Sequence, residues 1–344
     1  MRFSEAMRIE EQNDGRLVAN FDHSWWVVNG PNGGVIAALL IRAAQHYLGG
    51  DRCVRTATTH FLAAPKEGPV HLEVSVERQG RIAAFATVRM TQEDRPIATA
   101  LVACADMEIV SHEWEQRSFP TLPPIAETWV MTRNSDDVPL RSRWDQRWGL
   151  GVPGVPETST VPGGYEAGGW VRLAESEPYD EALLAAMADC WVPAVMVHSD
   201  VAVHTPTLEL TVQFRTDPRN IDLKRNDYCA AVFRQLSGRE GFIDETGAIW
   251  SSDGHLLALC RQIGVVLPRP DETLGQWEFV RSEFCSDFGV SVYTVMRWLI
   301  PALLVPMVIA GACRGGQSES PIEDADEPSI QLFVSGRSLD PFES

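Results

Sequence analysis

The chain has 344 residues, of which 44% are hydrophobic, so it can bury the core of two modest domains or of one fused pair. Its formal net charge of -18 repels nucleic acids and anionic membranes, so we discount nucleic acid as a partner. The seven cysteines show no CxxC spacing and the N-terminal region is polar, which favours a reducing cytoplasm as the location.

The first predicted elements are one helix and four strands. The helix covers Val35–Tyr47 and has glycines on both sides. Strand-like runs separated by turn sequences follow at Thr56–Leu62, Val70–Arg78, Ala83–Thr91 and Ile97–Asp106. A helix followed by strands at hairpin spacing predicts an antiparallel sheet wrapped round one helix, which is the hotdog arrangement.

The same order of elements returns after a segment rich in Pro, Gly and Trp, which we interpret as a linker with the opening strands of a second unit. The second set comprises a strand at Gly169–Leu173, a helix at Ala182–Val192, and strands at Thr207–Arg215, Tyr228–Leu236, Gly241–Ser251 and His255–Val266. We therefore predict an α+β fold of two fused hotdog units. The predicted parts are residues 1–106, a linker at 107–168, a second unit at 169–270, and a tail at 271–344.

The tail contains an apolar segment over residues 298–312. This segment is shorter than the about 20 apolar residues of a spanning helix, and it carries Pro301 and Pro306. One hypothesis is that residues 281–344 are foreign to the catalytic fold, and the other is a native C-terminal hairpin or anchor. A membrane is a partner only if the segment is an anchor.

Two polar residues interrupt apolar runs of the second unit. Asp189 is the only charge in residues 182–197, and small residues such as Ala185 and Ala186 would leave space beside it. A buried carboxylate is costly, so Asp189 is either hydrogen-bonded for structural reasons or kept for function. Gln262 follows Arg261 in a strand, so one of the two must face inwards, and the aligned residue of the first unit is Ala103.

In their order and spacing, these segments resemble the type II acyl-CoA thioesterases. GGVIAALL (33–40), THFLAAPKEGPV (59–70) and RQGRIAAFATVRM (78–90) resemble the first hotdog of that family. WVRL (170–173), ALLAAMADCWVPA (182–194), TLELTVQFR (207–215) and GFIDETGAIWSSDGHLLALCRQIGVV (241–266) resemble the second. The resemblance spans roughly residues 15–268. It implies an acyl-CoA thioester hydrolase of fatty acid metabolism.

In that family an aspartate on the second central helix, a threonine at the next strand start and a glutamine near the last strand end orient the attacking water. The corresponding residues here are Asp189, Thr207 and Gln262, and Thr207 rests on the resemblance because threonine is ordinary at a strand start. Family members often carry a serine before the aspartate, where this chain has Ala188. That difference puts the substrate preference in question.

Thioester hydrolysis also needs donors for the developing oxyanion, and backbone N–H groups at a helix N-terminus supply them. Gly33 and Gly34 begin the first central helix, so they are either oxyanion and substrate contacts or only a tight entry turn. The phosphates of CoA need basic partners, and the candidates, each of which can equally be a solvated surface charge, are Arg55, Lys224, Arg225 and Arg239.

Other catalytic patterns are weak. Gly149–Gly154 matches the GxGxxG pattern of a dinucleotide-binding loop, but Pro153 is incompatible with the helix that should follow. The GxSxG motif of serine hydrolases is absent from the sequence. Cys190 is more simply a core residue, and His198 and His204 lack a third ligand, so we predict neither metal nor cofactor. A hotdog hydratase or dehydratase and a non-catalytic acyl-CoA binder stay open as alternatives, as does assembly into a homo-oligomer.

Overall fold

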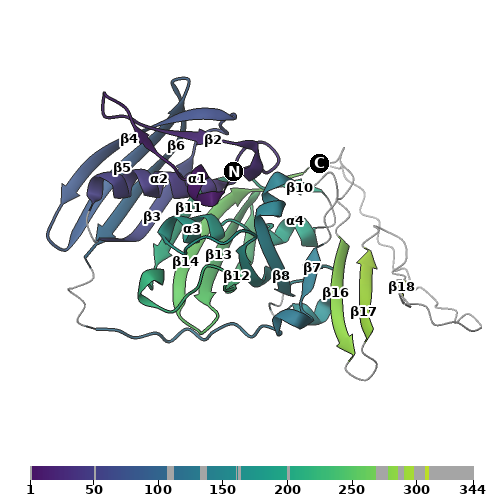
Figure 1. The fold of residues 1–344 in the computed structure, drawn as a ribbon. Coiled ribbons are helices and arrows are strands. Elements are labelled where there is room, and N and C mark those ends of the chain that lie inside the picture. The colour runs from purple at the N-terminus through teal and green to yellow at the C-terminus, as the bar shows by residue number, and fades with distance from the viewer. Residues whose placement is uncertain are drawn as a thin grey trace, which may run out of the picture. The chain divides into compact units, whose positions relative to one another are not determined.

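The computed structural model describes residues 2–49, 52–106, 112–131, 138–159, 161, 164–199, 202–268, 278–285, 290–297 and 307–309. Its N-terminal unit is a helix packed against an antiparallel sheet (Figure 1). The helix is α2 (Gly33–Leu48), and its buried residues lie on several sides of it. The sheet order is β1 (Glu10–Glu11), β2 (Leu17–Phe21), β4 (Gly68–Gln79), β5 (Ala83–Gln92), β6 (Arg95–Ala105) and β3 (Cys53–Phe61), and the short helix α1 covers Phe3–Ala6.

The C-terminal unit repeats this arrangement. Its central helix is α3 (Glu181–Met187), and its core strands lie in the order β11 (Thr207–Phe214), β14 (Leu256–Val265), β13 (Phe242–Ser251), β12 (Cys229–Arg239) and β9 (Tyr165–Leu173). The sheet continues through β8 (Trp144–Leu150), β7 (Trp129–Met131), β16 (Glu278–Cys285), β17 (Val290–Arg297) and β18 (Met307–Ile309). The remaining elements are α4 (Ala194–His198), the strand pair β10 (Val203–His204) and β15 (Leu267–Pro268), and single 3-10 turns at His23–Trp25, Ile125–Glu127, Pro139–Arg143, Pro156–Thr158 and Pro218–Asn220.

The two units share one sheet, joined where β3 pairs with β11. These strands are antiparallel, with Thr58 opposite Thr211 and their hydroxyl oxygens 2.9 Å apart. On either side of this pair the strands follow in mirrored order, β6-β5-β4-β2 in one unit and β14-β13-β12-β9 in the other. The prediction of an α+β fold built from two fused hotdog units is therefore confirmed.

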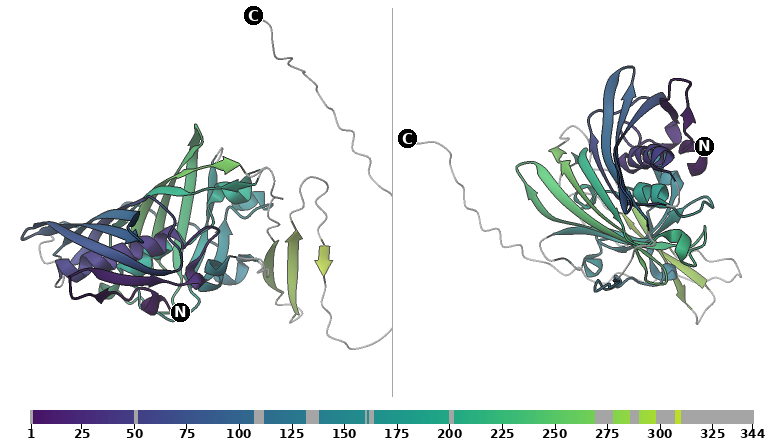
Figure 2. Two further views of the ribbon diagram at one scale, coloured as in Figure 1. Left: turned by 90° about the horizontal axis from the view of Figure 1, so that it is seen from above. Right: turned by 90° about the vertical axis from the view of Figure 1, so that its left-hand side faces the viewer.

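The central helices α2 and α3 pack directly against each other (Figure 2). They run antiparallel, because Gly34 at the start of α2 lies against Ala185 and Ala186 late in α3, whereas Arg42 pairs with Asp180 at the start of α3. Each end of the helix pair therefore joins the N-terminus of one helix to the C-terminal end of the other.

The predicted second helix, Ala182–Val192, is wrong at its C-terminal end. α3 stops at Met187, so Asp189 lies in the turn that follows it, and a separate helix α4 begins after Pro193. Proline has no N–H to donate and disfavours helical conformation in the residue before it, so the chain cannot continue as one helix into α4. The turn brings the Asp189 side chain out beyond the helix end.

The predicted tail is described only in part. β16 and β17 form a hairpin, and β16 also pairs with β7 through Phe279–Arg281. Of the apolar segment 298–312, only the residues of β18 are described, so the hypotheses on its origin stay predictions. Every helix in the described part of the chain falls short of the length and hydropathy of a membrane span.

Candidate active site

The three residues predicted to hold the water lie close together. Thr207 begins β11, and its hydroxyl donates to Oε1 of Gln262 on the adjacent strand β14 at 3.0 Å. Gln262 is buried and Arg261 is exposed, as strand alternation requires. The Gln262 amide also acts on Asp189, where it lowers the pKa of the carboxyl group. The turn after α3 and two neighbouring strands therefore meet at one point.

The Asp189 carboxylate sits on the N-terminus of α2, which belongs to the other unit. Asn32 caps that helix by accepting a hydrogen bond from the N–H of Val35, and its Nδ2 donates to Oδ2 of Asp189 at 2.9 Å. The N–H of Gly34 donates to the same oxygen at 2.9 Å. A carboxylate in this position also gains from the positive end of the helix dipole. The site therefore needs both hotdog units.

Close packing leaves little room for a side chain at positions 33 and 34. A Cβ atom on Gly34 would lie 2.8 Å from the carbonyl oxygens of Ala185 and Ala186, and one on Gly33 would lie 2.9 Å from Oδ2 of Asp189. The space that the small residues of α3 leave is thus filled by the start of α2. The backbone N–H groups of both glycines act on the Asp189 carboxylate, and a role of the pair as oxyanion donors stays a prediction.

Burial raises the pKa of Asp189 to about 6, and hydrogen bonds from Gly34, Asn32, Gly33 and Gln262 act in the opposite direction. The carboxyl group is therefore mainly ionised at neutral pH and is a stronger base than an exposed aspartate. A group with these properties can accept a proton from a bound water molecule.

Sequence reasoning missed a buried carboxyl group next to Gln262. Glu245 on β13 is only 5% exposed, and it accepts hydrogen bonds from Nε2 of Gln262 and, at 2.7 Å, from Nε2 of Gln235. Burial raises the pKa of Glu245 to about 7, and the charge of Asp189 also acts to raise it. The signal was present, because Ile243 and Glu245 occupy the same face of a strand on which Ile243 must be buried.

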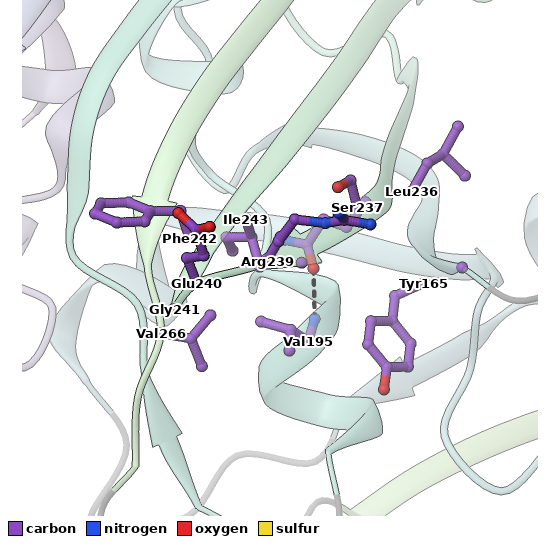
Figure 3. Close-up of a pocket in the computed structure, with 13 residues that line it drawn as sticks. Tyr165, Val195, Leu236, Ser237, Arg239, Glu240, Gly241, Phe242, Ile243 and Val266 are labelled. Carbon is purple, nitrogen blue, oxygen red and sulfur yellow. Dashed lines mark hydrogen bonds between the residues drawn. The ribbon is translucent and has the colours of Figure 1, made fainter.

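Two cavities adjoin these residues. The smaller is about 10 Å³, close to the space of one water molecule, and its lining includes Thr207, Gln262 and Glu245. The larger is about 300 Å³ and shares Gln235 and Ile243 with the smaller one. Its further lining is mostly apolar and is drawn in Figure 3, with Tyr165, Val195, Leu236, Phe242 and Val266 around Arg239.

The remaining candidates from the sequence are not part of this cluster. Burial raises the pKa of the Cys190 thiol well above its usual range, so it is no thiolate at neutral pH. The His198 ring stacks on Tyr165. Of the basic residues proposed for CoA, Arg239 lines the larger cavity, whereas Arg55 donates to the carbonyl oxygen of Arg215.

Solved structures with the same fold come from several bacteria. A hot dog protein of unknown function from Alicyclobacillus acidocaldarius is 26% identical in sequence and superimposes with a TM-score of 0.67. The match covers 77% of this chain and 97% of the Alicyclobacillus chain. A candidate thioesterase II from Thermobifida fusca YX is 24% identical, with a TM-score of 0.66 over the same shares. An acyl-CoA thioesterase II from Mycobacterium marinum is 16% identical, with a TM-score of 0.63 over 78% of this chain and 100% of its own.

Family models give the more specific result. The N-terminal domain model of acyl-CoA thioesterases matches residues 22–105, and the C-terminal domain model matches residues 115–266. No curated protein matches the sequence. The two models match in chain order, one on each hotdog unit, and together they cover most of the described fold. This protein therefore belongs to the acyl-CoA thioesterase family that these two domain models describe.

Proposed function

We propose that the protein hydrolyses fatty acyl-CoA to a free fatty acid and CoA, with a water molecule as the nucleophile. The observation that carries the proposal is the Asp189 carboxylate, held on the N-terminus of α2 and next to Gln262 and Thr207. Water attacks the thioester carbonyl carbon while one of its protons passes to Asp189. The tetrahedral intermediate then collapses, the carbon–sulfur bond breaks, and the thiolate of CoA leaves and takes the proton from Asp189, which is thereby ionised again.

The hydrogen-bond directions support distinct roles for the two neutral residues. The Thr207 hydroxyl donates its proton to Gln262, so its oxygen is left to accept from a water molecule. The N–H groups of Gly33 and Gly34 are the oxyanion donors in this proposal. For that, the carbonyl oxygen of the substrate takes a position beside Asp189 and shares these donors with it.

We assign the acyl chain to the larger cavity. It adjoins the cavity beside Thr207 and Gln262, and its lining is mostly apolar, which suits a ligand that gains about 0.8 kcal/mol per buried methylene. Arg239 in the same lining is a candidate partner for a CoA phosphate. Ile243→Trp would fill space at the junction of the two cavities. We expect kcat/KM for long chains to fall more than for short chains.

A panel of acyl-CoAs of increasing chain length, with detection of free thiol, tests the reaction. Release of thiol by the wild type and its loss in Asp189→Asn supports hydrolysis. Uniform absence of thiol release, with binding retained, would favour a non-catalytic acyl-CoA binder. Conversion of an enoyl-CoA or a hydroxyacyl-CoA without thiol release would favour a hydratase or dehydratase.

We propose the cytoplasm as the location. Five buried cysteines are free thiols, in keeping with a reducing compartment: Cys53, Cys104, Cys190, Cys229 and Cys260. Association into a homo-oligomer stays a prediction, which light scattering of the purified protein would test.

A further inference from the structure

We propose that Glu245 is a positioning residue that fixes the amide orientation of Gln262, and thereby sets which hydrogen bonds Gln262 and Thr207 offer to the reaction. The proposal rests on the hydrolytic function proposed above and adds a member to its machinery. Glu245 lies on β13, directly opposite Gln262 on β14 in the register of the two strands.

Glu245 is a costly residue to bury. It is 5% exposed, and among the described residues no arginine or lysine forms an ion pair with it. The titratable groups that face it are Asp189, across the turn after α3, and the thiol of Cys260 on β14. An apolar side chain would fill the same space without the cost of burying a carboxyl group. A carboxyl group kept there points to a role other than packing.

The two hydrogen-bond partners of Glu245 are both amides. One carboxylate oxygen accepts from Nε2 of Gln262, and the other accepts from Nε2 of Gln235 at 2.7 Å. Above its pKa of about 7 Glu245 is ionised and can only accept, so each amide then turns its NH2 group towards Glu245. Oε1 of Gln235 then accepts from the N–H of Val195 at 2.8 Å, which fixes the start of α4.

This orientation determines what Gln262 presents elsewhere. With its NH2 group on Glu245, its carbonyl oxygen faces Thr207 and accepts the hydroxyl proton. The second N–H of the same NH2 group then remains to act on Asp189, in agreement with the lowered pKa that Gln262 contributes there. A reversed amide would instead turn its carbonyl oxygen towards the Asp189 carboxylate. Both the water acceptor on Thr207 and the donor to Asp189 therefore depend on Glu245.

Glu245→Gln tests the proposal with almost no change in shape. The introduced amide offers one oxygen and one NH2 group, so only one of the two neighbouring amides keeps its acceptor. Reversing Gln235 would break its bond from the N–H of Val195. Reversing Gln262 rotates the Thr207 hydroxyl and removes one donor from Asp189, which keeps its hydrogen bonds from Gly34 and Asn32. We therefore expect Gln262 to reverse in this variant.

The kinetic readouts separate positioning from packing. We expect kcat for acyl-CoA hydrolysis to fall about 10-fold or more with little change in KM, the size typical of a lost orienting group. Reversal of Gln262 takes a donor away from the Asp189 carboxylate and so raises the pKa of Asp189, and the acid limb of the pH profile of kcat/KM should move to higher pH. The matched control is Glu166→Gln on β9, another buried glutamate of the same unit, whose carboxylate pairs with Arg234. We expect that control to keep the kcat and pH profile of the wild type.

A spectroscopic readout is independent of catalysis. In protein labelled with 15N-glutamine, the side-chain NH2 signals of Gln262, identified by their absence in Gln262→Met, should titrate with Glu245 near pH 7. They should lose that titration in Glu245→Gln but keep it in Glu166→Gln. Unchanged titration in Glu245→Gln, or an unchanged kcat and pH profile in that variant, would overturn the proposal. If the wild type releases no thiol from any acyl-CoA, the proposed function fails, and the NMR titration still decides whether Glu245 orients Gln262.

Discussion

The two ends of the central helix pair are related by the mirrored order of the sheet, but they differ in chemistry. At one end, the first turn of α2 has no acidic residue, and Asp189 of the other unit binds its N–H groups. At the other end, α3 begins with its own carboxylates. Asp180 accepts from the N–H of Leu183 and pairs with Arg42, and Glu181 pairs with Arg219. Among the described residues, a carboxylate of the other unit binds helix N–H groups at the first end, and the helix supplies its own carboxylate at the second.

The inward faces of equivalent strands differ in the same way. β5 and β6 present mainly apolar side chains to the core, among them Ala84, Ala86, Val102 and Cys104. β13 and β14 place Glu245 and Gln262 at buried positions. The inner face of these strands is thus apolar in the first unit and carries buried polar groups in the second. The comparison predicts that changes at the α2 end abolish turnover and that matched changes at the α3 end do not.

The largest effect is expected from Asp189→Asn. An asparagine keeps the shape and can still accept from Gly34, but it cannot take a proton from water. We expect kcat for acyl-CoA hydrolysis to fall about 100-fold or more, the usual contribution of a general base. Steady-state assays of thiol release measure this effect.

The matched control at the opposite end of the helix pair is Glu181→Gln. Glu181 is as buried as a site residue, and it accepts from the N–H of Val54. We expect this variant to lose some thermal stability and to keep its kcat. Equal loss of kcat in both variants would remove the functional distinction between the two ends.

The second prediction concerns variants in which the inner face of β14 becomes apolar, like that of β6. Gln262→Met should lower kcat at least about 10-fold and should also lower the free energy of unfolding by about 1–3 kcal/mol, because Glu245 loses a buried partner. The double variant Glu245→Leu/Gln262→Met removes both polar groups. We expect denaturant unfolding to show recovered stability without recovered kcat. Recovery of both would indicate that the polar pair has no part in turnover.

The third prediction separates packing from chemistry at the start of α2. In Gly34→Ala the new methyl group would lie 2.8 Å from two backbone oxygens of α3, so the two helices must move apart. We therefore expect the free energy of unfolding to fall by about 1–3 kcal/mol. In Gly33→Ala it would meet Oδ2 of Asp189 and the ring end of Phe61, which can shift. We expect this variant to lose more kcat than stability. Chemical unfolding and kinetics measured on both variants check the contrast.

Local sequence patterns predicted the strands well and the site only in part. Strand alternation is local, so β3, β5 and β11 were predicted within a few residues. The link between Asn32 and Asp189 depends on how the two helices pack across the units, and no local pattern contains it. The alignment of Ala103 with Gln262 also rested on local sequence alone, and the structure does not give the two residues equivalent positions. Ala103 is less buried than Val102 and Cys104 on either side, so it faces away from the core.

Glu245 could have been found by the argument that identified Gln262. It alternates with Asp244 in a strand, so one of the two must face the core, as Arg261 and Gln262 do in the next strand. What the sequence could not supply is the register that sets Glu245 opposite Gln262. Register depends on the pairing of two strands, and a shift of one residue would have turned either side chain to the other face.

The smallest expected effect is a dependence on pH at the α2 end. Asp189 must be ionised to accept a proton, and burial raises its pKa to about 6, so kcat/KM should fall as the pH drops through that value. The stability follows the opposite trend. Because its folded pKa is above its ordinary value of 3.8, Asp189 costs stability progressively as the pH rises from about 4 to about 6.

Urea unfolding between pH 4 and pH 8 would measure that cost, with Asp189→Asn as the comparison. In the variant, the free energy of unfolding should no longer fall between pH 4 and pH 6. The variant should therefore be more stable than the wild type at pH 8. The fall in the free energy of unfolding near pH 7 should persist in the variant, because burial also raises the pKa of Glu245, to about 7. A variant that is no more stable than the wild type at pH 8 would mean that hydrogen bonds from α2 already offset the burial of Asp189. Its carboxylate would then be explained by structure alone, and the two ends of the helix pair would be equivalent in energy.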